Sequence, residues 1–185
     1  MHPILNSLAA IAVAGTLLNP GVARAHEEGS RLSEEVWDQI ADLRRATASF
    51  HDIEAAFAAG YGPSPVVDIH GHACIDQPGQ GAMGIHYVNG NLLTPHLNPL
   101  QPQAMIYEPM PGGRMKLVAV EYIVFKSAWD GLFAGTTPKL FGQSFELVPA
   151  GNRYGLPDFY ELHLWAWKHN RSGLFADWNP AVHCR

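Results

Sequence analysis

Three ionisable side chains stand in short segments whose composition is typical of β-strands: His86, Glu121 and His163. Two histidines and one carboxylate, with coordination positions left open, form a ligand set that suits iron, manganese or zinc. Glu121 is the strongest signal, because the strand around it is otherwise apolar and a buried carboxylate is costly unless a cation or a hydrogen-bond donor meets it. We therefore predict a metal site at these residues, with Glu121 as a ligand or as a general base.

Side-chain alternation along each strand decides whether the three groups meet. Residues 160–169 divide into a core-facing set of Leu162, Leu164 and Ala166 and a second set of ionisable groups and indoles, which is Glu161, His163, Trp165, Trp167 and His169. If the three strands are neighbours, the three candidate ligands lie on one face, and a shift of one residue in any strand would turn its side chain away. The alternative is a purely structural role, in which Glu121 pairs with a histidine or with Arg153.

Four aromatic residues close to these ligands in the sequence predict the walls of the site. They are Tyr87, Tyr122, Trp165 and Trp167. Phenol and indole rings combine a large apolar surface with one polar atom, so they can line a cleft that binds an organic ligand or a cofactor. The alternative is that these rings are ordinary core residues.

His70 and His72 are the second choice of metal ligands. The H-x-H spacing places two imidazoles on one side of an extended segment, which suits metal binding. The alternative is a loop with solvated histidines. A separate copper site would form at His26 if signal-peptide cleavage leaves this residue first, because its amino group and its ring can chelate copper together.

Residues 1–25 have the organisation of a secretory signal peptide. Residues 4–18 are mainly apolar, and Ala23-Arg24-Ala25 fits the small-x-small cleavage rule, so the mature chain is predicted to begin at His26. No other stretch of the sequence is long and apolar enough to span a bilayer. We therefore expect a secreted or periplasmic protein with one domain at residues 26–185 and no membrane span after cleavage.

Charge and cysteine content narrow the class of protein further. The formal net charge of −5 provides no basic surface for nucleic acid. Cys74 and Cys184 form an even count, which in an exported chain indicates one disulfide. Such a bridge would contribute up to about 4–5 kcal/mol in the chain-entropy description. The alternative is two free thiols.

The order of segments predicts an α+β domain. Residues 30–59 show the three-four spacing of an amphipathic helix, Gly60 is a natural C-terminal residue for it, and a break near residues 49–52 would give two helices. The strands that follow are short, separated by turns and never joined by long helices, which favours antiparallel pairing. We expect an N-terminal helix or helix pair packed on a curved antiparallel sheet or small barrel.

Several of these segments together resemble a family of uncharacterised secreted bacterial proteins. The matching segments are GAMGIHYVN at residues 81–89, VEYIV at 120–124, LFGQ at 140–143, LHLWAWK at 162–168 and GLFADWNP at 173–180, followed by Cys184. The chain departs from the family at Asn170-Arg171, where a typical member has Asn-Pro. The resemblance covers most of the mature chain and implies export and the importance of these segments, but it implies no activity.

The leading prediction is an exported protein that binds a divalent transition metal (Fe, Mn, Zn or Cu) in a sheltered aromatic cleft. As an enzyme it would be a metal-dependent oxygenase or hydrolase. One alternative is a non-catalytic module that binds a small-molecule ligand or a partner. Another is a metal storage or delivery protein of the cell envelope. The residues leave the substrate, the metal and the oligomeric state open.

Overall fold

A computed structural model describes residues 32–184 of the chain. The predicted signal peptide at residues 1–25, its cleavage site and the candidate copper ligand His26 lie outside the described residues. None of the helices within residues 32–184 has the length and apolar character needed to cross a membrane.

The first described elements are three consecutive helical segments. They are α2 (Glu34–Thr47), the 3-10 helix η1 (Ala48–His51) and α3 (Ile53–Ala58). Ser33 caps α2 by accepting a hydrogen bond from the Val36 amide at 3.3 Å, and Asp52 caps α3 by accepting one from the Glu54 amide at 3.1 Å. The helical region therefore breaks at residues 48–52, where Asp52 begins a new helix. The result is a pair of α-helices, α2 and α3, joined by η1.

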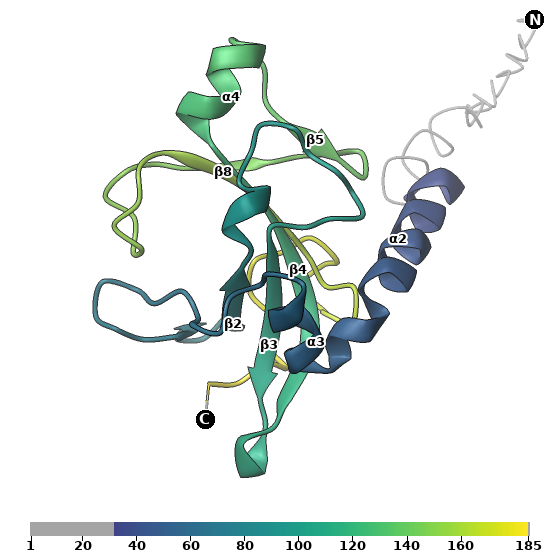
Figure 1. Ribbon diagram of the computed structural model, residues 1–185, viewed down its shortest axis with the longest axis vertical. Coiled ribbons are helices and arrows are strands. Elements are labelled where there is room, and N and C mark those ends of the chain that lie inside the picture. The colour runs from purple at the N-terminus through teal and green to yellow at the C-terminus, as the bar shows by residue number, and fades with distance from the viewer. Residues whose placement is uncertain (1–31, 185) are drawn as a thin grey trace, which may run out of the picture. The chain divides into compact units, whose positions relative to one another are not determined.

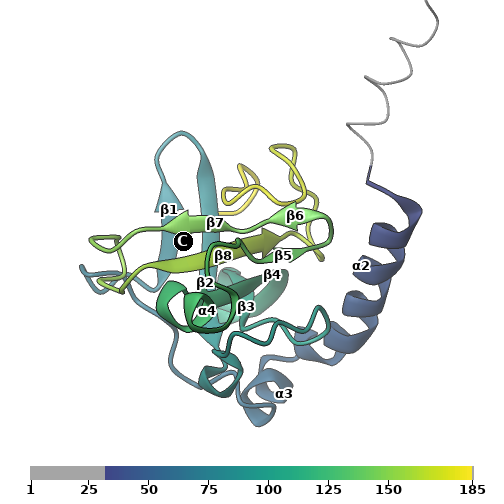
Figure 2. The same ribbon diagram turned by 90° about the horizontal axis from the view of Figure 1, so that it is seen from above.

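Six antiparallel strands form a sheet that curls into a half-barrel (Figure 1, Figure 2). In spatial order they are β1 (Cys74–Gln77), β2 (Gly81–Val88), β3 (Ala104–Pro109), β4 (Met115–Phe125), β8 (Phe159–Leu164) and β7 (Glu146–Val148). The other elements are η2 (Gly90–Leu92), η3 (Pro111–Gly113), α4 (Lys126–Phe133) and a small sheet of β5 (Lys139–Leu140) and β6 (Gln143–Ser144). The N-terminal helices and the curled sheet confirm the predicted α+β class.

The helical segments cover one face of the sheet. The Tyr107 hydroxyl donates a hydrogen bond to the carbonyl of Phe50 at 2.7 Å, and the ring centroids of Phe57 and Tyr87 are 5.2 Å apart. Adjacent residues of a strand point to opposite faces of a sheet. His86, which directly precedes Tyr87 on β2, therefore points away from the helices.

Strand pairing around β4 fixes the positions of the candidate ligands. Glu121 is directly opposite His163 on β8 and directly opposite Ala104 on β3. His86 lies one strand further away, on β2, where it is opposite Ile106. The small side chain of Ala104 and the curl of the sheet leave room for His86 to reach across β3 toward Glu121.

The irregular segment at residues 165–184 is bound to the start of β2. Ala82 and Asn179 exchange two backbone hydrogen bonds, of 3.2 and 3.1 Å. The buried Asn179 side chain also donates to the carbonyl of His169 and accepts from the amide of Ala181. Gly81 is required at this contact, because its φ is +105° and a Cβ there would lie 2.2 Å from the carbonyl oxygen of Asn179.

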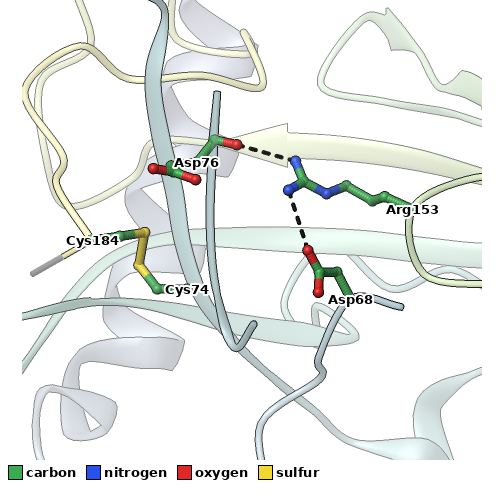
Figure 3. Close-up of a disulfide and its surroundings, with 5 residues drawn as sticks. All are labelled: Asp68, Cys74, Asp76, Arg153 and Cys184. Carbon is green, nitrogen blue, oxygen red and sulfur yellow. Dashed lines mark hydrogen bonds and ion pairs between the residues drawn. A yellow bond between two sulfur atoms is a disulfide. The ribbon is translucent and has the colours of Figure 1, made fainter. Parts of the chain in front are cut away.

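A disulfide joins Cys74, at the start of β1, to Cys184 (Figure 3). The two Cα atoms are 5.5 Å apart, and the bridge spans a sequence separation of 110 residues. The predicted pairing is therefore confirmed. The bridge ties the C-terminal segment to an edge strand of the sheet.

Removal of the bridge in the double variant Cys74→Ala, Cys184→Ala is expected to lower the melting temperature by about 5–15 °C. The reason is that a cross-link over so long a loop restricts the unfolded chain strongly. Calorimetry of the wild type and of the double variant measures the difference in melting temperature. Wild-type protein treated with a reductant is the control, and it should melt close to the variant. Two titratable thiols in the native protein, or an unchanged melting temperature, would contradict the prediction.

Candidate metal centre

His86, Glu121 and His163 meet on the face of the sheet that points away from the helices. The Nε2 atoms of the two histidines are 3.5 Å apart, and the Glu121 oxygens lie 3.6 Å from His86 Nε2 and 3.8 Å from His163 Nε2. All three residues are buried, with exposed fractions of 4%, 4% and 1%. The structure thus brings the three candidate ligands together in a site that is shielded from bulk water.

These separations are close to the ligand spacing of a metal site. A tetrahedral ion with ligand bonds of about 2.0–2.1 Å has ligand atoms about 3.3–3.4 Å apart. The three contacts of 3.5, 3.6 and 3.8 Å exceed this spacing by a few tenths of an ångström. Small rotations of the side chains would therefore place both Nε2 atoms and a Glu121 oxygen on one ion and leave further coordination positions open.

Burial and neighbouring charge give the two histidines different protonation states. Burial lowers the pKa of His86 to about 4, so that its ring is neutral at pH 7 and can offer a lone pair. Burial also lowers the pKa of His163, but the carboxylates of Glu121, Asp177 and Glu161 outweigh this effect and raise that pKa to about 9. In the absence of a cation His163 carries the positive charge of the centre, and a bound metal ion would replace this proton.

Two further acidic side chains extend the centre. Glu161 lies two residues before His163 on the same face of β8, and burial together with the Glu121 carboxylate raises the pKa of Glu161 to about 9. Asp177 enters from the C-terminal segment. Glu161, His163 and Asp177 form a second set whose potential ligand atoms all lie within 4.8 Å of one another. The centre therefore holds three carboxyl groups around two histidines, a balance that favours a cation.

Asp177 is placed to orient the ring of His163. Its Oδ1 atom lies 3.6 Å from His163 Nδ1, the nitrogen on the far side of the ring from Glu121. Metal-bound histidines in proteins commonly donate their second ring N–H to a carboxylate, which fixes the tautomer and directs the other nitrogen at the metal. Asp177 stands on the side of the ring that such a carboxylate occupies, although at 3.6 Å the contact is longer than a hydrogen bond.

A cavity of about 300 Å³ borders His86 and Glu121. Its floor continues along the sheet to Ile123 and Phe125, and its walls come from residues 66–67 and residues 154–156. A ligand in this cavity would contact two of the three candidate metal ligands directly.

Tyr87 and Tyr122, predicted to wall the site, lie on the other face of the sheet. The ring of Tyr87 packs on an N-terminal helix, and the ring centroid of Tyr122 is 5.6 Å from that of Phe141. Each tyrosine directly follows a candidate ligand in its strand. The alternation that turns the ligand toward the centre therefore turns the tyrosine away from it.

Trp165 and Trp167 also lie outside the cavity, because β8 ends at Leu164. Beyond that residue the Trp165 amide donates to the carbonyl of Leu174 at 3.0 Å, and the Trp167 amide to that of Val118 at 3.1 Å. Trp165 is a core residue with 1% exposure, and the indole of Trp167 donates to the first helix. The cavity is walled instead by aliphatic side chains and by other aromatic rings.

His70 and His72, the second choice of metal ligands, lie on an exposed loop. Their amides both donate to Asp68 Oδ1 at 2.9 Å, and their ring centroids are 6.1 Å apart. Within the described part of the chain, neither belongs to a group of three potential metal ligands. Asp68 holds this loop, and its Oδ2 atom lies 3.6 Å from Arg153 Nη2 (Figure 3).

The structure places three further residues at or beside the centre for which the sequence predicts no role in the site: Glu161, Asp177 and Tyr154. Glu161 shares the strand alternation of His163, and this alternation is the signal that identifies it. Asp177 and Tyr154 come from irregular segments, where no periodicity relates a residue to the sheet.

Comparisons with protein-family models, with curated proteins and with solved structures find no match to this chain. The family resemblance carried by residues 81–89 and 162–168 stays a prediction. The function is therefore inferred from the geometry of the centre and of its cavity.

Asp68→Asn is expected to lower the melting temperature near neutral pH and to lose this effect in acid. The backbone amide of His72, helped by that of His70, outweighs burial and lowers the pKa of Asp68 from 3.8 to about 2. A carboxyl group whose pKa is lowered by folding stabilises the protein above its unfolded pKa. This contribution is lost as the pH falls from about 4 to about 2. The difference in melting temperature should therefore shrink across this range.

Asp38→Asn, at an exposed position of α2, is the matched control for this experiment. Thermal melts of wild type and both variants at a series of pH values give the comparison. A difference between wild type and Asp68→Asn that stays constant from pH 6 to about pH 2 would show that the charge of Asp68 does not stabilise the loop.

Proposed function

We propose that the protein is exported and binds one divalent transition metal ion through His86, Glu121 and His163. The observation that carries this proposal is the set of ligand separations, 3.5, 3.6 and 3.8 Å, among three buried side chains. All three are longer than the usual hydrogen-bond length of about 2.7–3.2 Å. The three separations are therefore closer to the spacing of ligands on one metal ion, about 3.3–3.4 Å, than to the length of hydrogen bonds between these groups.

The charge balance supports a cation at the centre. Glu121 and Glu161 are buried carboxyl groups, and Asp177 adds a third beside His163. Buried carboxylates that repel one another keep a proton unless a positive charge is supplied, and the raised pKa of Glu161 follows from this. A divalent ion would compensate the surplus and bind Glu121 as one of its ligands.

The position of the cavity supports a catalytic role. An ion held by His86 and Glu121 would border the cavity, so its open coordination positions could meet a bound molecule. Glu161, which lies outside the lining and retains a proton beside Glu121, would exchange that proton with Glu121 rather than with the bound molecule itself. On this interpretation the protein is a metal-dependent oxygenase or hydrolase.

Export is supported by two independent features. The disulfide between Cys74 and Cys184 is of the kind that persists in oxidising compartments, and residues 1–25 have the pattern of a signal peptide. We place the protein in the periplasm or outside the cell.

A non-catalytic ligand-binding module is the second candidate. The cavity beside His86 and Glu121 favours it, because its walls are formed by the chain itself and need no ion. Metal storage or delivery is less well supported, since an ion that must be exchanged is better held by exposed ligands than by three buried ones.

His86→Ala and His163→Ala are each expected to abolish stoichiometric metal binding, because each removes one of three protein ligands. Glu121→Gln keeps the shape of the side chain but removes its charge. The affinity should then fall by at least about 100-fold, more than the roughly 10–100-fold typical of changes outside the ligand set. Elemental analysis of protein purified without a histidine tag, loaded with Zn²⁺, Fe²⁺ or Mn²⁺ and desalted, measures the stoichiometry.

His51→Ala and His96→Ala are the controls, because both residues are exposed and lie outside the centre. Both variants should bind metal as the wild type does, and thermal melts establish that each variant is folded. If the wild type and all variants bind no metal and only stability changes, the three residues form a structural cluster and the proposal fails.

A further inference from the structure

The cavity beside the centre is enclosed by separate parts of the chain. Its floor is the sheet face that carries His86 and Glu121, one wall is formed by residues 66–67, and another wall by residues 154–156. Its volume of about 300 Å³ is at the lower end of the range of roughly 300–1,000 Å³ found for ligand sites. The space therefore suits a small molecule.

The lining selects for an uncharged molecule. Apart from His86 and Glu121, the lining side chains are apolar except for Tyr154, whose hydroxyl contacts the sulfur of Met83 at 3.7 Å. None of the described residues that line the cavity is a lysine or an arginine. In the absence of the metal ion, a carboxylate, phosphate or sulfate would find no counter-charge in the lining and would approach Glu121. A sugar would leave most of its hydroxyl groups without hydrogen-bond partners.

Two exposed apolar side chains line the cavity, one on each of these walls. Val67 is 46% exposed and Leu156 is 36% exposed, and both belong to the lining. Exposed apolar side chains at the rim of a cavity with a few polar groups at its base are typical of a site for an apolar ligand. The two residues thus mark the mouth of the cavity.

An ion pair outside the cavity connects the two walls. Arg153, which directly precedes one wall, lies 3.6 Å from Asp68, which directly follows the other (Figure 3). The Ile69 amide donates to the carbonyl of Arg153 at 2.8 Å, and the Val66 amide donates to the carbonyl of His86 at 2.9 Å. The walls are therefore fixed before a ligand binds, which reduces the entropy cost of binding.

We propose that this cavity binds a small, uncharged, largely apolar molecule whose one polar group faces His86, Glu121 and the metal ion. This proposal concerns the class of small molecule that binds beside the metal ion, and it rests on the function proposed above. At about 30 Å³ per water molecule, the cavity has the volume of about ten waters, which corresponds to a substituted bicyclic aromatic compound or a short branched chain. The apolar body would contact Ile123 and Phe125, and the polar group would meet an open position of the ion.

1-Naphthol is the test ligand, and naphthalene, 1-naphthoate and 1-naphthylmethylammonium are matched probes with the same ring system. Each is titrated at neutral pH into protein as purified, with its metal content measured, and into protein treated with a chelator. We expect 1-naphthol to bind both forms and 1-naphthoate, which Glu121 repels, to bind the metal-free form at least about 10-fold more weakly. We expect 1-naphthylmethylammonium, which the metal ion repels, to bind the metal-loaded form at least about 10-fold more weakly than 1-naphthol does. Metal loading should tighten the binding of 1-naphthol and not that of naphthalene, because only 1-naphthol has a polar group.

Leu156→Trp fills the mouth of the cavity and should weaken 1-naphthol binding by at least about 10-fold without changing the metal content. Leu147→Trp is the matched control, because Leu147 is 41% exposed on β7 and lies outside the lining. Thermal melts establish that both variants are folded. Val67→Trp provides a second obstruction on the other wall if Leu156→Trp does not fold.

The outcomes separate the ligand class from the metal. Protein that holds a stoichiometric metal but does not bind 1-naphthol, or whose metal-free form binds 1-naphthoate as tightly as 1-naphthol, overturns the inference and leaves the metal function in place. Binding of 1-naphthol that Leu156→Trp blocks, in protein that takes up no metal, supports the apolar cavity and overturns the metal function.

Discussion

Burial of the Glu121 carboxylate is the constraint on which the centre depends. The residue lies on β4, in the middle of the sheet, with 4% exposure, where an uncompensated charge would be strongly destabilising. The register of β8 places His163 directly opposite, and His86 reaches across β3 to within 3.6 Å. The same two histidines that make a buried carboxylate tolerable complete a ligand set with it. With Glu161 and Asp177 nearby, the surplus of acid must be met by a proton or by a cation.

Loops and the C-terminal segment, rather than the helices, complete this centre. Asp177 reaches His163 because the pairing of Asn179 with Ala82 and the disulfide hold the C-terminal segment against the first strands. The walls of the cavity are joined through Arg153 outside the lining. The helices pack on the other face of the sheet, where they contribute to the core. The face that carries the candidate site also contributes to the core, through a buried cluster that includes Ile106, Ala119 and Trp165.

Strand alternation predicts the convergence of the three candidate ligands because its period is short and local. The α+β class follows from the same patterns, and the disulfide from the even cysteine count. The aromatic wall could not be predicted in this way. Extending the alternation through Trp165 and Trp167 assumes a longer strand, but β8 ends at Leu164, where backbone contacts with Leu174 and Val118 replace strand pairing. The position of Asp177 likewise depends on long-range contacts of an irregular segment.

X-ray absorption spectroscopy of the zinc-loaded protein tests the central claim most directly, because it identifies the ligands of the ion in solution. We expect two imidazole nitrogens at about 2.0–2.1 Å, with the outer-shell scattering of histidine rings, and carboxylate oxygen at about 2.0–2.2 Å. A coordination sphere made of oxygen alone, with no histidine scattering, would contradict the assignment of His86, Glu121 and His163 as the metal ligands.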